Sequence, residues 1–359
     1  MLTSYAALCV AAEDLSALHY RPTQSVSGTI RVWGNAQMRA LVQRWGVAFR
    51  RWQPQAKLQL HMTGSDIGMA GLYTGRADLA VLGRASTDSE TKAFEWIYGY
   101  RPLALQILCG SLDQAGRSPA LVVFVHQSNP LAQLALAQLA AIFNDDSRSR
   151  TAAIRRWDQL GLRGEWANQA IHIYSVDTES GTGRFFRHEV LDDGRLLNWD
   201  NLTEFKDRRN SDGSVVTSRA QILGALARDR YGIALTSLPA SEAGVRPIAL
   251  GSKPGGSYYQ ATARSLIARR YPLSRAIFAY VNRRGAGPME PKVREFLRFV
   301  LSRDGQSQVR ARDGYLPLSA ALAREQLQDL DGTAVAFRLI SESESKLQAA
   351  AHELPLPTP

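Results

Sequence analysis

The sequence predicts an α/β protein of two domains, and three observations support this prediction. The chain has 359 residues, of which 45% are hydrophobic, and this is enough for two domains that each bury a core. From Ile30 onward, short apolar strands alternate with segments of helical periodicity. Gly-rich and Ser-rich turns separate these segments, as in proteins whose strands are connected through helices.

The first elements predict a β-α-β unit. Strand 30–33 is followed by apolar residues at helical spacing, which predict a helix with one apolar face. These residues are Met38, Leu41, Val42, Trp45 and Phe49. Residues 57–62 alternate between polar and apolar, which indicates a half-buried strand. A turn then opens a helix that runs to about Thr74, and residues 78–82 form the next strand.

The rest of the chain continues the alternation. Strands are expected at 103–108, 121–126, 171–174, 232–235 and 277–281, and helices after Pro130, after Ser180, at 219–228 and at 291–301. The segment 148–163 is polar and irregular, and no repeat of fixed period is visible. Residues 331–359 become polar and Pro-rich, so we expect a flexible C-terminal tail.

Charge and composition restrict the classes of function. Lys and Arg number 43 against 33 Asp and Glu, and the formal charge of +10 favours anionic partners. The basic residues are scattered rather than gathered in a stripe, so nucleic acid is not the expected partner. The chain contains no apolar run long enough for a spanning helix, and its two cysteines exclude a disulfide framework. Residues 1–26 begin with an apolar stretch that is short for a signal peptide, and we interpret them as a possible remnant of an export signal.

Catalytic motifs are missing or incomplete. The segment 179–183 lacks the Gly that a nucleophile elbow requires two residues before its Ser. His188-Glu189 has no second His three residues later, and the Gly-rich segment 251–256 lacks the Lys of a phosphate-binding Walker loop. The sequence therefore predicts a protein that is not an enzyme and that needs no cofactor or metal.

Three Gly/Ser turns, at 34–37, 64–66 and 180–182, are the candidate site. Each follows a predicted strand and precedes a predicted helix, so backbone N–H groups and the positive helix end can converge on an anion. The hydroxyls of Ser65, Ser180 and Thr182 would be further donors. The alternative is that Ser65 and Ser180 are ordinary helix N-caps, which is the commoner role of Ser at such positions.

Several segments jointly resemble the phosphate-binding proteins of ABC importers, a subfamily of the type II periplasmic binding proteins. The segment 64–80 resembles the family's G-S-S-x-G turn with its helix and following strand, and 174–182 resembles its Y-G-R-D-x-G-S-G-T anion turn. Further similar segments are Val122 to Pro130, Tyr271 to Arg275, Val293 to Leu297 and Gly314 to Leu318. The resemblance spans roughly 28–318.

This resemblance implies a fold of two lobes, each a mixed, mostly parallel sheet flanked by helices, with a hinge of two strands. Lobe 1 would comprise 27–123 and 237–330, and lobe 2 would comprise 124–236. The ligand, inorganic phosphate or a related oxyanion, would bind between the lobes and favour their closure. The protein would be a periplasmic monomer that reaches the membrane only through the ABC permease that receives its ligand.

The resemblance also implies a ligand shell. Its members would be Ala36, Gln37, Met38, Ser65, Gly83, Arg84, Ser180, Gly181 and Thr182. The family usually has Thr at 37, Arg at 176 and Gly at 179, where this chain has Gln, Val and Glu, and some members have Asp at 83. A missing charge-assisted contact at Val176 would cost about 1.5 to 3 kcal/mol, or about tenfold to a hundredfold in affinity.

These departures change the charges expected beside the turns. Arg84 is a candidate to replace the missing guanidinium, since Arg can bind an oxyanion through two parallel hydrogen bonds. Asp66 and Glu179 place negative charge beside two of the turns, which disfavours an anion unless both side chains point away. The alternative function is a sensor or envelope interaction protein with the same fold and an altered or lost anion site.

Overall fold

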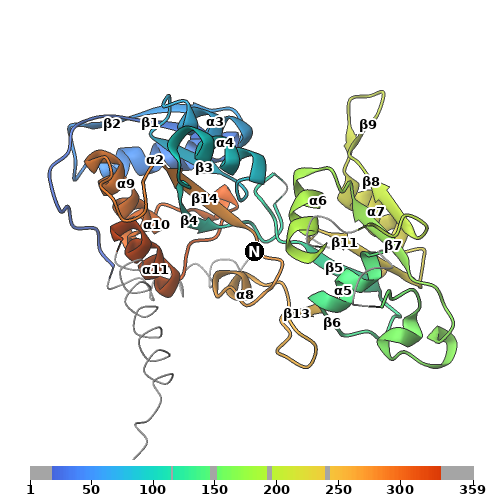
Figure 1. Ribbon diagram of the computed structural model, residues 1–359. Helices are drawn as coiled ribbons and strands as arrows, with labels where there is room; N and C mark the ends of the chain where they lie inside the picture. The colour runs from blue at the N-terminus through green and yellow to red at the C-terminus, as the bar shows by residue number, and fades with distance from the viewer. Residues whose placement is uncertain (1–17, 115, 146–151, 192–195, 239–242, 333–359) are drawn as a thin grey trace, which may run out of the picture. The chain divides into compact units, whose positions relative to one another are not determined.

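The computed structural model describes residues 18–114, 116–145, 152–191, 196–238 and 243–332. These residues form two compact units (Figure 1). The chain enters the second unit at Cys109, leaves it after Arg275 and returns to it for Gly314–Leu316. The expected export-signal remnant, up to residue 17, and the expected tail, beyond residue 332, lie outside the described residues.

A five-stranded mixed sheet in the order β2-β1-β3-β14-β4 forms the centre of the first unit. Strand β1 is parallel to both β2 and β3, whereas β14 is antiparallel to β3, so the predicted β-α-β unit is confirmed. The strands are β1 (Gly28–Gly34), β2 (Ala56–Met62), β3 (Leu79–Leu82), β4 (Leu103–Cys109) and β14 (Ala276–Val281).

Helices cover both faces of this sheet, as the alternation of its side chains requires. Gly71 of helix α3 (Asp66–Tyr73) lies against Trp33, and Gly46 of helix α2 (Arg39–Phe49) lies against Leu58. Leu58 lies beside Ile30 in the sheet, so both side chains are on one face. Trp33 is three residues after Ile30 in β1, and its side chain is therefore on the other face, as is that of its neighbour Ala80. The other helices of the unit are α4 (Asp88–Tyr98), α9 (Pro291–Leu301), α10 (Arg303–Gln306) and α11 (Ala320–Asp331), with short 3-10 turns η1 (Ala36–Met38) and η5 (Ala311–Asp313).

A second five-stranded mixed sheet, β12-β5-β11-β7-β8, forms the centre of the second unit. Strand β11 is antiparallel to β5 and parallel to β7, which pairs in parallel with β8. The strands of this unit are β5 (Val122–His126), β6 (Gln133–Ala135), β7 (His172–Val176), β8 (Leu202–Phe205), β9 (Arg208–Arg209), β10 (Val215–Val216), β11 (Gly232–Thr236), β12 (Val245–Pro247) and β13 (Ala249–Gly251).

The second unit also holds four α-helices among its described residues, together with three shorter turns. These are α5 (Leu136–Phe143), α6 (Gly181–Phe186), α7 (Ser218–Leu226) and α8 (Ala263–Ile267), the 3-10 turns η2 (Trp157–Leu160) and η3 (Gly164–Trp166), and the π-helical turn η4 (Arg187–Leu191). Trp157, in the segment that we expected to be irregular, is fully buried. It donates from its indole Nε1 to the carbonyl of Tyr231, 3.0 Å away.

The unit boundaries differ from the lobe boundaries that we expected at residues 124 and 236. The second unit includes 109–123 and 237–275 as well. Strand pairing explains the difference, because β12 pairs with β5 and β13 pairs with β6. Tyr271 also donates its hydroxyl proton to the carbonyl of Leu121, 2.9 Å away, so both added segments belong to the core of this unit.

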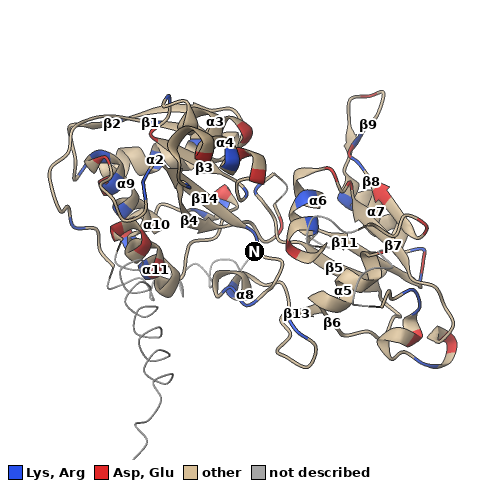
Figure 2. Ribbon diagram, viewed as in Figure 1, with Lys and Arg blue, Asp and Glu red and all other residues tan. Residues whose placement is uncertain are grey.

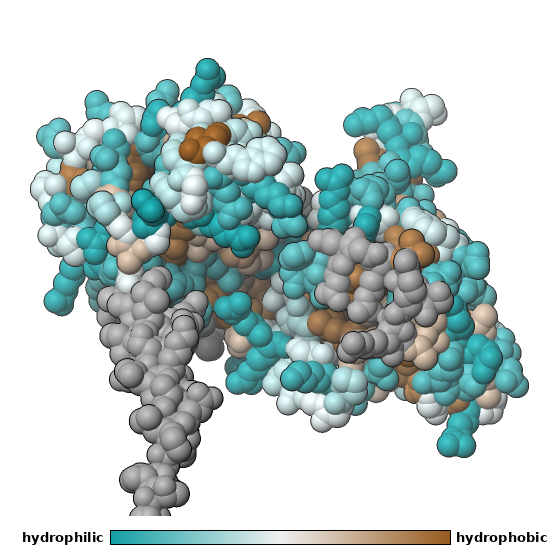
Figure 3. Space-filling model, in the orientation of Figure 1, coloured by the Kyte–Doolittle hydropathy of each residue, from teal (hydrophilic) through white to brown (hydrophobic). Residues whose placement is uncertain are grey.

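The surface of the described residues carries mixed charge. Figure 2 shows Lys and Arg scattered among Asp and Glu along the ribbon of each unit. On the face shown in Figure 3, apolar side chains form separate patches among hydrophilic ones. No helix among the described residues is both long and apolar enough to span a membrane.

Candidate anion site

The predicted ligand shell comes from four segments: 36–38, Ser65, 83–84 and 180–182. The first three meet at one edge of the first sheet, where β1 and β3 end. Gly64 N donates to the carbonyl of Gly34, 3.0 Å away, and joins the first two turns. Gly83 N donates to Ser65 Oγ at 3.1 Å, which joins the second turn to the end of β3. These two hydrogen bonds bring the two turns and the end of β3 together.

Gly34 makes this close approach possible. Its φ is +144°, and a Cβ at this position would lie 1.9 Å from the carbonyl oxygen of Val81. Gly68, in the first turn of α3, is close to the same place, since its own Cβ would lie 3.4 Å from the Cα of Gly34 and 2.8 Å from Cδ1 of Leu82. A side chain at position 34 would separate β1 from β3 and move the turns apart.

Two backbone amides of the first turn donate hydrogen bonds within the turn itself. Asn35 Oδ1 accepts from Gln37 N at 2.9 Å, and the carbonyl of Asn35 accepts from Met38 N at 3.0 Å. The side chain of Met38 is fully buried, whereas Ala36 and Gln37 are exposed. Asn35, which the sequence did not single out as a functional residue, therefore determines how this turn presents its backbone.

Arg84 makes two ion pairs that the sequence did not predict. Its guanidinium donates to both oxygens of Glu90 at 2.8 Å and to Asp66 Oδ1 at 2.6 Å. Hydrogen bonds that Arg84 donates to Glu90 and Asp66 raise its pKa, although burial acts in the opposite direction. One guanidinium thus pairs with two carboxylates within the first unit, and one of them is Asp66 beside the second turn.

The third turn lies in the second unit, at the start of α6. Ser180 is the N-cap of this helix, and its Oγ accepts from Gly183 N at 3.0 Å and donates to the carbonyl of Asp177 at 2.5 Å. Ser180 therefore fills the ordinary capping role that was the alternative interpretation. Thr182, one position into the first turn of the helix, accepts at Oγ1 from Arg275 Nη1, 3.3 Å away.

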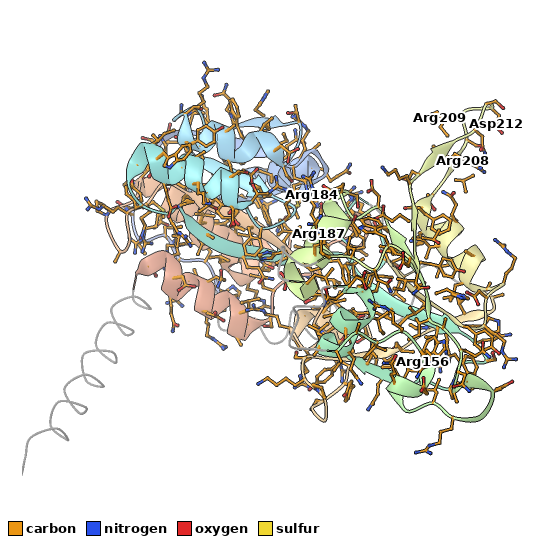
Figure 4. All side chains as sticks on the ribbon, turned by 45° about the vertical axis from the view of Figure 1, so that its right-hand side comes forward. Arg156, Arg184, Arg187, Arg208, Arg209 and Asp212 are labelled. Carbon is orange, nitrogen blue, oxygen red and sulfur yellow. The ribbon has the colours of Figure 1, made fainter. Side chains whose placement is uncertain are left out.

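Glu179 is also paired, so it does not leave an open negative charge beside the third turn. Its carboxylate lies 2.7 Å from Arg187 Nη1 and 3.5 Å from Arg184 Nη2. Figure 4 shows both arginines on the helical segment that follows the turn. Each acidic departure from the family pattern is therefore paired with arginine of its own unit.

The metal-ligating side chains of the described residues are dispersed, and the one described thiol is buried. These residues contain no group of three or more His, Cys, Asp and Glu side chains arranged to hold a metal ion. Cys109 is buried, and burial raises the pKa of its thiol to about 12, which keeps it protonated at neutral pH.

The chain matches a known superfamily of proteins. The model of the PBP superfamily domain matches residues 21–304, so the chain belongs to this superfamily. Among curated proteins it is 30% identical over 326 residues to the phosphate-binding protein PstS of Pseudomonas aeruginosa, covering 90% of this chain and 94% of that protein. Protein SphX of Synechococcus elongatus is 24% identical over 76% of this chain and 72% of its own length.

Solved structures show the same fold. PstS from Borrelia burgdorferi matches with a TM-score of 0.55 and 18% identity, over 82% of this chain and 100% of that one. An ABC-type phosphate transport receptor from Vibrio cholerae matches with a TM-score of 0.52 and 18% identity, over 80% of this chain and 99% of that one. These structures confirm the predicted α/β fold, and the superfamily match together with the Pseudomonas aeruginosa relative confirms the family resemblance.

Proposed function

We propose that this chain is an extracytoplasmic solute-binding protein that captures phosphate or a related oxyanion and delivers it to the permease of an ABC transporter. The observation that carries the proposal is the likeness to the phosphate-binding protein of Pseudomonas aeruginosa, which extends over 90% of the chain. The two site regions support it, because each brings helix-start amides and hydroxyls to the end of a strand.

The proposed ligand groups are the exposed first turn at Ala36 and Gln37, the turn at Ser65, and the turn at 180–182. Met38 and Gly83 contribute through the backbone in this proposal, since the Met38 side chain is buried and Gly83 has none. Arg84 acts indirectly in this proposal, by pairing with Asp66. We assign no catalytic step to these residues, and we place the protein in the periplasm as a monomer.

Calorimetric titration of the purified chain with inorganic phosphate tests this function, with sulfate and nitrate as comparisons. We expect saturable binding of one phosphate per chain. Ser65→Ala should weaken binding by about threefold to tenfold, because it removes one neutral hydrogen-bonding group. Ser307→Ala is the matched control in the same unit, since the Ser307 hydroxyl donates only to the local carbonyl of Asp304, 2.8 Å away.

Two outcomes would contradict the proposed function. If neither heat nor a thermal shift accompanies any of the oxyanions, the chain is not a solute receptor for this ligand class, and the sensor function with a lost site takes its place. Hydrolysis of a phosphate ester that disappears with Ser180→Ala would contradict the assignment as a non-enzymatic protein.

A further inference from the structure

Arg275 is a buried arginine that the sequence did not connect with the candidate site. Its side chain reaches the first turn of α6, where Nη1 donates to Thr182 Oγ1 at 3.3 Å. The guanidinium carbon lies 5.0 Å from the centre of the Phe185 ring, in the geometry of a cation–π contact. Only 8% of Arg275 is exposed, which is unusual for an arginine.

The backbone around Arg275 is held in place from two sides. Its carbonyl accepts from Gly110 N at 2.7 Å. A Cβ at Gly110 would lie 2.2 Å from the carbonyl of Ser118 and 3.1 Å from that of Arg275, so this approach requires glycine. Two residues earlier, the carbonyl of Leu273 accepts from Leu121 N at 3.1 Å. The guanidinium that contacts α6 thus comes from a segment that is distant in sequence and whose backbone is held by hydrogen bonds.

The carboxylates closest to the turn in sequence are bound by other basic residues. Glu179 pairs with Arg184 and Arg187, and Asp177 Oδ2 lies 3.2 Å from Lys206 Nζ. Arg275 places a guanidinium beside Thr182 Oγ1, at the start of α6. Val176, at the end of β7, brings no charge to this place.

The direction of the hydrogen bond determines what Thr182 can do. Because Arg275 donates to Thr182 Oγ1, a lone pair of the hydroxyl oxygen is used, and the hydroxyl proton can be donated to another acceptor. An oxyanion bound at the turn would be such an acceptor. It would also bring negative charge close to a guanidinium that has little contact with water.

We propose that Arg275 is the residue that supplies the guanidinium for oxyanion binding at residues 180–182, and that it orients the Thr182 hydroxyl toward the ligand. This inference rests on the proposed function and adds to it a specific determinant of affinity. It replaces the interpretation in which Arg84 compensates for the uncharged position 176.

The test is titration of the full chain and its variants with inorganic phosphate at two ionic strengths. Arg275→Gln removes the charge and keeps a hydrogen-bond donor, and it should weaken binding by about tenfold to a hundredfold. Arg275→Lys keeps the charge and should retain a larger part of the affinity. Arg270→Gln is the matched control, because Arg270 is exposed, lies five residues earlier and stacks on Tyr259 with its guanidinium carbon 5.9 Å from the ring.

Each outcome separates this inference from the proposed function. Absence of phosphate binding by the wild-type chain overturns the function and the inference together. Phosphate binding by the wild type and equal binding by Arg275→Gln overturns the inference alone. A purely structural role also contradicts it: Arg275→Lys and Arg275→Gln would then lose affinity equally, in proportion to their loss of melting temperature, and with the same dependence on ionic strength as the wild type.

Discussion

At the scale of single residues, ion pairs with arginine determine which charges the site regions present. Asp66 and Glu179 are not part of the usual family pattern and disfavour an anion when considered alone. In the structure, Arg84 binds Asp66, and Arg184 and Arg187 bind Glu179. The effect of a substitution near a binding turn therefore depends on the partner that accompanies it.

The ion pair between Asp78 and Arg31, away from the site, allows the contribution of such a pair to stability to be measured. The Asp78 carboxylate accepts from Arg31 Nη2 at 2.6 Å, from Nε at 3.2 Å and from the Arg31 backbone N at 2.8 Å, and so ties β1 to the start of β3. Asp78→Asn should lower the free energy of unfolding by about 1 to 3 kcal/mol at pH 7, because bonds to a charged acceptor are lost. Asp158→Asn, in an exposed pair with Arg156, should leave the unfolding midpoint unchanged.

The pH dependence of this effect has a definite sign. Burial would raise the pKa of Asp78, but the hydrogen bonds from Arg31 outweigh burial and lower it from its usual 3.8. The contribution is therefore present at pH above about 4 and is lost as the pH falls through the folded-state value. Urea unfolding at pH 7 and pH 3 should show a smaller difference between wild type and Asp78→Asn at pH 3. An equal difference at both values would contradict the prediction.

The sequence predicted the positions of the turns better than it predicted the contacts of the side chains near them. The turn motifs are local, so their positions could be recognised from spacing alone. The pairing of Arg84 with Glu90 depends on rotamers in the folded unit, and the contact between Arg275 and Thr182 joins residues 93 positions apart. Neither leaves a signal in a single sequence.

At the scale of elements, the turn before α6 depends on a glycine inside the helix. A Cβ at Gly183 would lie 2.3 Å from the carbonyl oxygen of Asp177 and 2.4 Å from the Cα of Thr178, both of which are backbone atoms. Gly183→Ala should therefore distort the turn and lower the free energy of unfolding by about 2 to 3 kcal/mol. Gly181→Ala is the matched control, because a Cβ there meets no atom within 4 Å.

Chemical denaturation of both variants measures the difference. Gly181→Ala should be as stable as the wild type or slightly more stable, since Ala favours a helix more than Gly does. Equal stability of Gly183→Ala and the wild type would show that the turn adapts easily, and it would weaken the case for a preformed third turn.

Elements with a regular apolar period were predicted, and elements without one were missed. The alternation at 57–62 and the apolar spacing after Met38 correspond to β2 and to η1 with α2. Helix α4 was missed although Thr87 and Glu90 form a capping box at its start. The reason is physical: α4 buries only Phe94, and Trp96 is 87% exposed, so few of its apolar residues mark a buried face.

At the scale of the whole molecule, the fold class could be predicted, but the borders of the units could not. Strands β12 and β13 have three residues each, too few to establish an alternating pattern. Their assignment to the second unit follows from pairing with β5 and β6, segments that lie more than a hundred residues earlier in the chain. Such pairing is decided by the packing of the complete unit.

Ligand binding should also be visible in the stability of the whole chain. A ligand that binds only the folded state stabilises it, and phosphate at about 100 times its dissociation constant should add about 2.7 kcal/mol to the free energy of unfolding. The net charge of +10 means that any salt also relieves repulsion between positive charges. Chloride at matched ionic strength therefore measures the non-specific part, and thermal unfolding in the two salts isolates the specific part. Equal stabilisation by chloride and phosphate would show that the anion acts only by screening, because a specific site must distinguish an oxyanion that accepts several hydrogen bonds from a spherical ion of single charge.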